Sequence, residues 1–336
     1  MPNRPSRRRR AAVASAAVGA LLAVAACSGG SDTEGGGPTT PTSTRSTSTT
    51  TPSTSASGGL PDGFGPGPAG KGLQRFYNQR VEWKPCQQGE CARVWVPLDY
   101  SDPNGQAITV EMARLASTGS STIGTLFINP GGPGGSGVEF TTSNPLDYEL
   151  TSHYDVVGFD PRGVGRSTPL DCLSDADLDA FVAANPSPET PAEIKEVEDG
   201  WTHYVQGCEQ RSGPLLDHVS TVDVARDLDV MRALVGDDKL HYFGFSYGTY
   251  IGATYAGLFP DKVGRMVLDG AVDPEASPLK SEILQTKGFE TALTAYLEDC
   301  ISKGNCPLGD SVAAGKQTID SLMSTIAASP LPTQSG

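Results

Sequence analysis

The sequence predicts an α/β fold built on a mostly parallel sheet. Short apolar runs alternate with helix-like segments between residues 94 and 268, which is typical of βαβ crossovers. One of these runs leads directly into a Gly-x-Ser-x-Gly sequence, and another leads into a glycine-rich turn. Polar, proline-interrupted segments at 172–219 and 275–336 are expected to form helical caps over the edge of the sheet.

Six apolar runs are expected to be strands, because they are short, rich in β-branched and aromatic residues, and bounded by turn residues. They are residues 94–98, 108–115, 122–129, 154–159, 240–243 and 263–268. The last four read as buried strands of a parallel sheet. A helix is expected from Thr221 to Val235, because its apolar residues recur every three or four positions and Gly236 follows it. A second helix is expected over residues 247–258.

The amino terminus has the features of an export signal. Residues 1–26 combine a basic start, an apolar stretch and small residues, and Cys27 follows as in a bacterial lipobox. An ordinary signal peptide with an incidental cysteine is the alternative, and Ser6-Arg7-Arg8 also permits twin-arginine export. Residues 27–70 are dominated by Ser, Thr, Gly and Pro and are expected to be a disordered tether. We therefore expect an exported domain, held by lipid on Cys27 at the outer face of a bacterial cytoplasmic membrane or secreted.

Net charge argues against nucleic-acid binding. The chain carries 25 basic and 39 acidic residues, a formal charge of −14. Such an acidic body repels phosphate backbones, so no nucleic-acid partner is expected.

The cysteines indicate disulfides rather than a metal site. Apart from Cys27, the 7 cysteines of the chain leave an even set, which in an exported protein favours disulfides although many pairings are possible. Pairing of neighbours is expected: Cys86–Cys91, Cys172–Cys208 and Cys300–Cys306. A zinc site is disfavoured because there is no Cys-x-x-Cys pair and no nearby histidine, so neither a metal nor a cofactor is expected.

The Gly-x-Ser-x-Gly sequence is the principal candidate for chemistry. Ser246 lies between Gly244 and Gly248, after an expected strand and before an expected helix. A sharp strand-to-helix turn needs small residues on both sides of a nucleophile, and it directs the amino end of the helix toward a developing oxyanion. A tight structural turn without chemistry is the alternative. The glycine-rich residues 129–137 lack the Gly-Lys-Ser/Thr of a phosphate-binding loop, so they are expected to direct backbone N–H groups inward instead.

These blocks together resemble a known family. Residues 129–137, 158–167, 244–250 and 268–270 are similar to secreted α/β-hydrolases of the proline iminopeptidase and tripeptidyl aminopeptidase group. The lipoprotein-like export signal and the strand-to-helix turn at residues 244–250 most resemble the actinobacterial tripeptidyl aminopeptidase branch. The resemblance covers about residues 75–336. It implies an α/β-hydrolase domain over 71–336 and an exopeptidase that removes short peptides from free amino termini, with esterase activity common among relatives.

The fold also suggests which groups stabilise an oxyanion. In α/β-hydrolases one donor comes from the glycine-rich loop and the other from the residue after the nucleophile. We therefore expect the N–H groups of Gly132 and Tyr247 to serve, with Gly131 as the alternative to Gly132. In the resembled enzymes the segment after Phe159 braces the loops near the nucleophile, so Asp160 and Arg162 are expected to be a structural pair, with a catalytic role as the alternative.

The general base is missing from the expected order. In this fold an acid and then a histidine follow the nucleophile, but all 4 histidines, His153, His203, His218 and His241, precede Ser246. His241 lies five residues before Ser246, or about 16 Å along a strand. Asp269 is a weak candidate acid, since the resembled branch places its acid one strand later.

The chain end suggests an explanation for the missing base. Residues 329–336 read as a proline-rich connector rather than a closing element. We therefore expect this chain to be the amino-terminal portion of a longer hydrolase, without the last strands and with little activity of its own.

Three functions remain open from the sequence. The first is a serine exopeptidase acting through an acyl-enzyme on Ser246; the second is a carboxylesterase on the same scaffold; the third is a non-catalytic envelope lipoprotein. A peptide substrate would need a carboxylate for its free α-amine. Glu139, Glu198 and Glu282 are unranked candidates.

Overall fold

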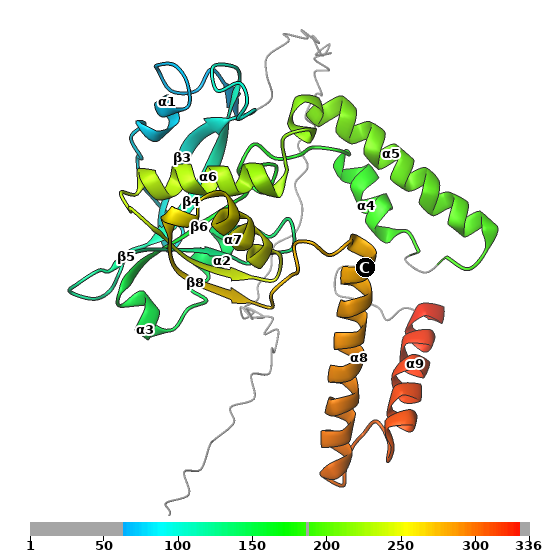
Figure 1. The fold of residues 1–336 in the computed structure, drawn as a ribbon. Coiled ribbons are helices and arrows are strands. Elements are labelled where there is room, and N and C mark those ends of the chain that lie inside the picture. Colours follow the sequence, from blue (N-terminus) through cyan, green and yellow to red (C-terminus); the bar gives the residue numbers. More distant parts are fainter. Residues whose placement is uncertain (1–62, 186–187, 330–336) are drawn as a thin grey trace, which may run out of the picture. The chain divides into compact units, whose positions relative to one another are not determined.

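The computed structural model describes residues 63–185 and 188–329 (Figure 1). The expected signal peptide, Cys27, residues 27–62 of the tether and residues 330–336 lie outside the described residues. No helix within the described ranges is long and apolar enough to span a membrane.

An eight-stranded mixed sheet forms the centre of the described chain (Figure 1). Its strands are β1 (Phe64–Gly65), β2 (Lys84–Cys86), β3 (Gly89–Pro97), β4 (Ala107–Leu115), β5 (Gly124–Asn129), β6 (Tyr154–Phe159), β7 (Leu240–Phe245) and β8 (Val263–Asp269). The order is β2-β3-β4-β6-β5-β7-β8, and β1 pairs with β4. The strands from β6 to β8 in this order are parallel, whereas the pairs from β2 to β6 are antiparallel. The carboxyl ends of β5 and β7 therefore lie side by side.

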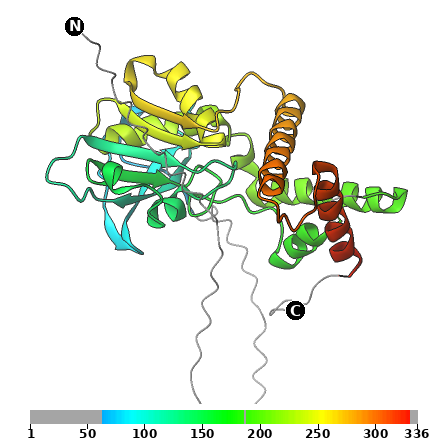
Figure 2. The same ribbon diagram turned by 90° about the horizontal axis from the view of Figure 1, so that it is seen from below.

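Helices cover both faces of the sheet (Figure 1, Figure 2). On β5, Phe127 belongs to the main core cluster, with residues of α6 (Thr221–Leu234) and α7 (Tyr247–Leu258). Its neighbours Leu126 and Ile128 belong to a second cluster, against which Phe140 of α2 (Gly137–Thr142) packs. Because successive side chains of a strand point to opposite faces, the sheet is buried on both sides. The short helices are α1 (Gln74–Tyr77) and α3 (Tyr148–Thr151), with a 3₁₀ turn at Pro260–Lys262.

The segments expected as caps are helical. They contain α4 (Asp175–Ala183), α5 (Pro191–Leu216), α8 (Pro278–Ser302) and α9 (Val312–Ala328). Thr190 and Glu193 form a reciprocal cap at the start of α5, which satisfies its first N–H groups. The helices α8 and α9 pack closely, since a Cβ added to Gly315 would lie 2.6 Å from a methyl carbon of Leu297. Coverage of a sheet edge by these helices stays a prediction.

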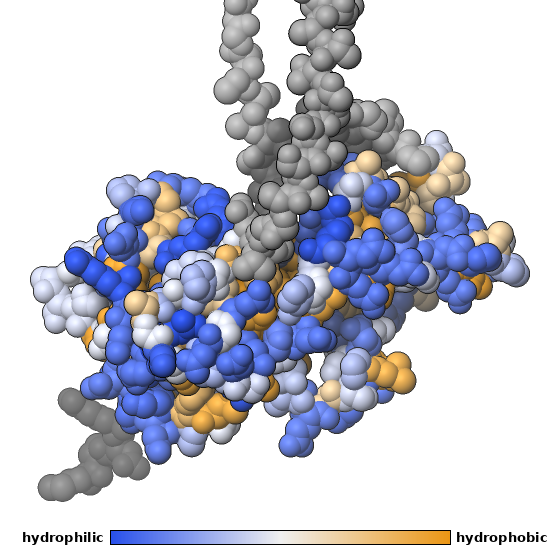
Figure 3. Space-filling model, turned by 90° about the horizontal axis from the view of Figure 1, so that it is seen from above, coloured by the Kyte–Doolittle hydropathy of each residue, from blue (hydrophilic) through white to orange (hydrophobic). Residues whose placement is uncertain are grey.

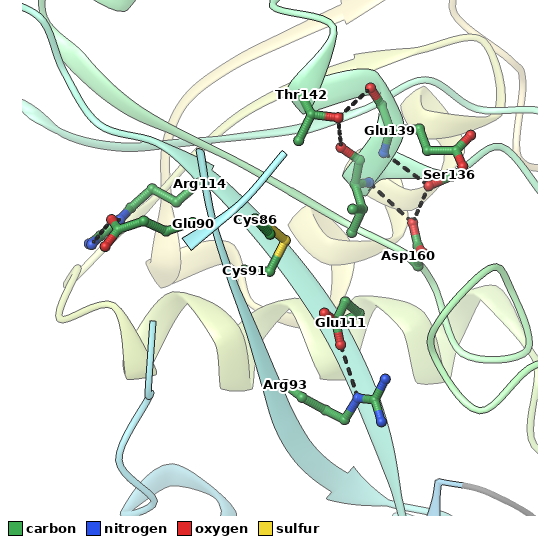
Figure 4. The surroundings of a disulfide bond; sticks show 11 residues. Cys86, Glu90, Cys91, Arg93, Glu111, Arg114, Ser136, Glu139, Thr142 and Asp160 are labelled. Atoms are coloured by element: carbon green, nitrogen blue, oxygen red, sulfur yellow. Dashed lines mark hydrogen bonds and ion pairs between the residues drawn. A yellow bond between two sulfur atoms is a disulfide. The ribbon is translucent and has the colours of Figure 1, made fainter. Parts of the chain in front are cut away.

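The three disulfides join the expected pairs. Cys86–Cys91 links β2 to β3 (Figure 4). Cys172–Cys208 ties the segment before α4 to α5, and Cys300–Cys306 closes the turn after α8. On the face that Figure 3 shows, hydrophilic residues predominate, with hydrophobic residues between them.

The main elements follow the sequence, with two corrections. The expected tether over residues 27–70 extends too far, because Phe64–Gly65 forms β1 and pairs with β4. Strand 154–159 and helix 247–258 have the predicted bounds, and the expected strand 240–243 continues to Phe245. The prediction that 263–268 is a buried strand is wrong. In the described chain β8 has β7 as its strand partner and lies at the end of the sheet, so Val267 is 53% exposed.

Candidate active site

Ser246 lies at a strained turn between β7 and α7. Its backbone has φ 52° and ψ −122°, a left-handed conformation that residues with a Cβ rarely adopt. The Ser246 N–H donates to the Asp269 carbonyl of the neighbouring strand at 2.9 Å, which anchors the turn to β8. The residue is exposed, and its hydroxyl makes no hydrogen bond within the described chain.

The flanking glycines are required by close backbone contacts. A Cβ added to Gly244 would lie 2.4 Å from the Gly248 carbonyl oxygen, and one added to Gly248 would lie 2.6 Å from the Asn129 carbonyl oxygen. The Tyr242 hydroxyl donates to the Gly248 carbonyl at 2.8 Å. Because these neighbours are main chain, they cannot rotate away from a side chain. The clearance expected from Gly244 and Gly248 is thus a structural requirement.

The glycine-rich loop after β5 lies directly against this turn. Gly131 has φ 91°, and a Cβ there would lie 2.4 Å from the Phe245 carbonyl oxygen and 2.8 Å from the Tyr247 nitrogen. The Gly131 N–H donates to Asn129 Oδ1 at 3.0 Å and is therefore occupied. Within the described chain, the N–H groups of Gly132 and Tyr247 donate to no other group. This difference favours Gly132 over Gly131 as an oxyanion donor.

Thr249 joins the turn to the segment that follows β8. Its hydroxyl donates to the Ser246 carbonyl at 2.6 Å and accepts from the Val272 N–H at 2.9 Å. Its side chain is buried. Thr249 was not among the residues predicted from the sequence, although a threonine three residues after the nucleophile can donate back to the nucleophile's carbonyl.

A cavity of about 500 Å³ opens beside Ser246. Besides Ser246 it is lined by Gly270, Ala271, Val272, Asp273 and Ala276 after β8, and by Ser281, Leu284, Gln285, Gly288 and Phe289 of α8. The wall is largely apolar, as in most small-molecule sites.

Asp273 is the ionisable residue of the cavity wall. The Glu275 N–H donates to its carboxylate at 3.0 Å and lowers its pKa, and Lys280 Nζ lies 3.5 Å away. None of the glutamates considered for an α-amine lines this cavity. Glu139 is in α2, Glu198 is in α5, and Glu282 lies on α8 beside the lining residue Ser281.

None of the four histidines lines the Ser246 cavity. His241 is near the start of β7, where its Nδ1 accepts from the Arg265 N–H at 3.0 Å. Burial, followed by the charge of Arg265, lowers the pKa of His241.

The other three histidines lie elsewhere. His153 is hydrogen-bonded at the end of α3, His203 lies on α5, and the His218 carbonyl accepts from Arg162. The exposed carboxylate of Asp269, the weak candidate acid, makes no hydrogen bond or ion pair within the described chain. The described residues therefore supply no base in contact with Ser246, and they contain no group of three or more His, Cys, Asp or Glu suited to a metal.

The expected pairing of Asp160 with Arg162 is wrong. Asp160, at the end of β6, accepts from Ser136 Oγ at 2.6 Å and from the Val138 N–H at 3.1 Å (Figure 4). It also accepts from the Arg166 N–H at 2.9 Å. Asp160 therefore anchors the end of the glycine-rich loop and the start of α2.

Arg162 faces the opposite side of the sheet. It makes a bidentate ion pair with Asp227 of α6: Nη2 donates to Oδ1 at 2.6 Å and Nε donates to Oδ2 at 2.7 Å. Both side chains are fully buried. Arg162 is the second residue of a turn that begins directly after Asp160, in which the Val164 N–H donates to the Pro161 carbonyl. Both are structural, as predicted, but they brace different elements.

Comparisons with known proteins show the fold family and the relatives of this chain. The family model described as the alpha/beta hydrolase fold matches residues 124–331. The serine protease Hip1 of Mycobacterium tuberculosis is 42% identical over 259 residues, covering 73% of this chain and 50% of Hip1. The tripeptidyl aminopeptidase of Streptomyces coelicolor is 40% identical over 225 residues, covering 62% of this chain and 42% of that enzyme.

A third relative carries an esterase name. Carboxylesterase B of Mycobacterium tuberculosis is 38% identical over 228 residues, covering 66% of this chain and 44% of that protein. The chain thus spans about half the length of the curated relatives it matches. It belongs to the α/β-hydrolase fold family and is related to the Hip1 serine protease and the Streptomyces tripeptidyl aminopeptidase.

Proposed function

We propose that this chain provides the nucleophile and oxyanion hole of a serine exopeptidase that releases short peptides from free amino termini. The observation that carries the proposal is the isolated Ser246 hydroxyl at a strained strand-to-helix turn, facing a cavity beside two unused N–H groups. The relation to a serine protease and a tripeptidyl aminopeptidase supports it.

The proposed reaction proceeds through an acyl-enzyme. Ser246 Oγ attacks the scissile carbonyl carbon, and the carbonyl oxygen becomes an oxyanion held by the N–H groups of Gly132 and Tyr247. The amino end of α7 adds a favourable dipole. A base must take the Ser246 proton and give it to the leaving amine as the C–N bond breaks, and water must then hydrolyse the acyl-enzyme, which releases the acyl product and regenerates the Ser246 hydroxyl. No histidine near Ser246 supplies this base. We propose that base and acid come from outside the described residues and that the 336-residue chain alone shows no more than trace turnover.

Asp273 is the proposed site for the substrate α-amine. It is the ionisable side chain of the cavity wall, and like any unperturbed aspartate it is ionised at neutral pH; the Glu275 N–H lowers its pKa further. Its ion pair with Lys280 is exposed, and such pairs contribute little energy. A substrate ammonium group can therefore displace Lys280 at small cost.

A substitution at Asp273 tests this proposal. In the longest natural protein containing this chain, Asp273→Asn is expected to raise KM for peptides with a free amino terminus at least 10-fold. Hydrolysis of short acyl esters should be unchanged. Glu282→Gln is the matched control, because Glu282 is a carboxylate that follows the lining residue Ser281 on α8 but does not itself line the cavity. An equal effect on both substrate classes would overturn the assignment of Asp273.

A carboxylesterase is the second candidate, supported by the largely apolar cavity and by the relation to Carboxylesterase B. A panel of aminoacyl peptides and acyl esters separates it from the exopeptidase. The third candidate is a non-catalytic lipoprotein. Labelling of the longest natural protein by a fluorophosphonate, dependent on Ser246, excludes this candidate, and absence of labelling of that protein supports it.

We also propose export and lipid attachment at Cys27, on the sequence pattern alone. Mass spectrometry of the mature amino terminus tests it. A diacylglyceryl group on Cys27 is the expected result, and an unmodified Cys27 would contradict it.

A further inference from the structure

One face of α8 forms a wall of the cavity beside Ser246. The helix contributes Ser281, Leu284, Gln285, Gly288 and Phe289. These positions are spaced at i, i+3, i+4, i+7 and i+8, so they follow one side of the helix. The cavity wall is therefore a continuous helix surface rather than a few isolated contacts.

The chemistry of this surface is apolar. Leu284 is 53% exposed and Phe289 is 67% exposed, although both side chains would gain by leaving water. The other lining segment, which follows β8, contributes Ala271, Val272 and Ala276, and these are also apolar. A ligand that fills this space removes both apolar walls from water.

Gly288 leaves the middle of the helix wall open. A Cβ added there would have no other atom within 4 Å, so the space in front of it is empty. Glycine in the interior of a helix is less favourable than alanine by roughly 0.5–1 kcal/mol. Gly288 has no atom close to the position of an added Cβ, and its φ is not positive. Neither close packing nor backbone conformation therefore requires glycine at this position. The free volume it leaves is the feature that distinguishes it from any other residue.

We propose that this cavity binds an uncharged apolar group on the acyl side of the scissile bond, and that Gly288 determines how large that group can be. The inference rests on the proposed function, since it takes Ser246 as the point of attack. The preferred substrate is then an acyl group, or a residue of a peptide, with an extended aliphatic or aromatic side group next to the scissile carbonyl.

Binding of neutral amides tests the cavity without any turnover. Acetamide, butyramide and hexanamide are titrated into the 336-residue chain, and affinity is measured by NMR line shifts. Each methylene that becomes buried is expected to strengthen binding up to about fourfold, so hexanamide should bind at least 10-fold more tightly than acetamide. Gly288→Leu should remove this increment and leave acetamide unchanged. Equal affinities for the three amides, or an unaltered series in Gly288→Leu, would overturn the proposal.

The matched control is Gly257→Leu. Gly257 is also a helical glycine with no atom within 4 Å of an added Cβ, and it lies near the far end of α7 outside the cavity wall. The control should keep the full amide series. If Gly257→Leu loses it as well, the effect is not specific to the cavity and the proposal fails.

Hydrolysis of p-nitrophenyl acetate, butyrate and hexanoate by the longest natural protein separates the cavity from the catalytic proposal. One outcome is turnover that depends on Ser246, together with a preference for hexanoate that Gly288→Leu reverses. This outcome supports both the cavity proposal and the hydrolase proposal. Turnover with no change in preference overturns the cavity proposal alone. Amide binding that Gly288→Leu abolishes, without any turnover that depends on Ser246, supports the cavity as an apolar site and refutes the hydrolase.

Discussion

The backbone of Ser246 makes a stability prediction that does not depend on activity. At φ 52° and ψ −122°, a residue with a Cβ is strained, whereas glycine is not. Ser246→Ala keeps the Cβ and its strain, and Ser246→Gly removes both. Each variant also removes the hydroxyl, which makes no hydrogen bond within the described chain. Comparison of the two variants therefore isolates the backbone conformation.

The size of the effect follows from two opposing contributions. A non-glycine residue in a sparsely populated region costs about 1–3 kcal/mol. Glycine in place of alanine lowers the free energy of unfolding by about 0.4–1 kcal/mol, because the unfolded chain gains conformational freedom. Ser246→Gly should thus be more stable than Ser246→Ala by about 1 kcal/mol, or about 2–4 °C in Tm for a domain of this size.

Thermal and urea unfolding of both variants measure this difference. Ser143 provides the control, because it ends α2 with an ordinary φ of −74°. There the order should invert, with Ser143→Gly less stable than Ser143→Ala. If Ser246→Gly is no more stable than Ser246→Ala, the turn is not strained and the interpretation of Ser246 as a held nucleophile loses its main support.

Three further predictions follow from single contacts. Gly131→Ala would place a Cβ 2.4 Å from a carbonyl oxygen at a positive φ, so we expect at least about 2 kcal/mol of destabilisation in urea unfolding and loss of any fluorophosphonate labelling; an unchanged midpoint would contradict the close approach. Arg162→Met leaves Asp227 buried without its ion partner and should cost about 3–5 kcal/mol of unfolding free energy; a cost under about 1 kcal/mol would show that the pair is dispensable. Burial lowers the pKa of His241, so its contribution to stability is complete above its unfolded pKa of about 6.5 and is lost as the pH falls through the lower folded pKa. His241→Asn, which keeps an acceptor for the Arg265 N–H, should therefore show a flatter loss of stability between about pH 7 and pH 5 than the parent, and parallel profiles would count against this linkage.

The strands were predictable where their environment is uniform. The run 154–159 is buried along most of its length, and apolar residues there have a single explanation. The run 263–268 is equally apolar, yet β8 has a strand neighbour on one side only within the described chain. The composition of a segment indicates whether it can form a buried strand. Its position in the sheet, and hence its burial, also depends on the other strands. This is why the burial of β8 could not be predicted locally.

Side-chain partners were less predictable than backbone contacts. Asp160 and Arg162 are two residues apart and of opposite charge, which made a pair plausible. Arg162 instead lies within the turn that follows Asp160 and pairs with Asp227, 65 residues away in sequence, and no local pattern signals that contact. The same holds for Asp273, which reaches the Ser246 cavity only because the segment after β8 passes the amino end of α7.

Glycines were informative because they mark where two backbones meet. Gly131, Gly244 and Gly248 come from two segments more than 100 residues apart, yet each has a main-chain atom where its Cβ would be. A side chain at Gly131 or Gly248 would push the chain around the end of β5 away from the Ser246 turn, and one at Gly244 would meet the Gly248 carbonyl within the turn itself. The distance from that loop to the hydroxyl is therefore determined by the absence of side chains. A sequence can show that absence, and this is why the backbone part of the site was predictable while its carboxylate was not.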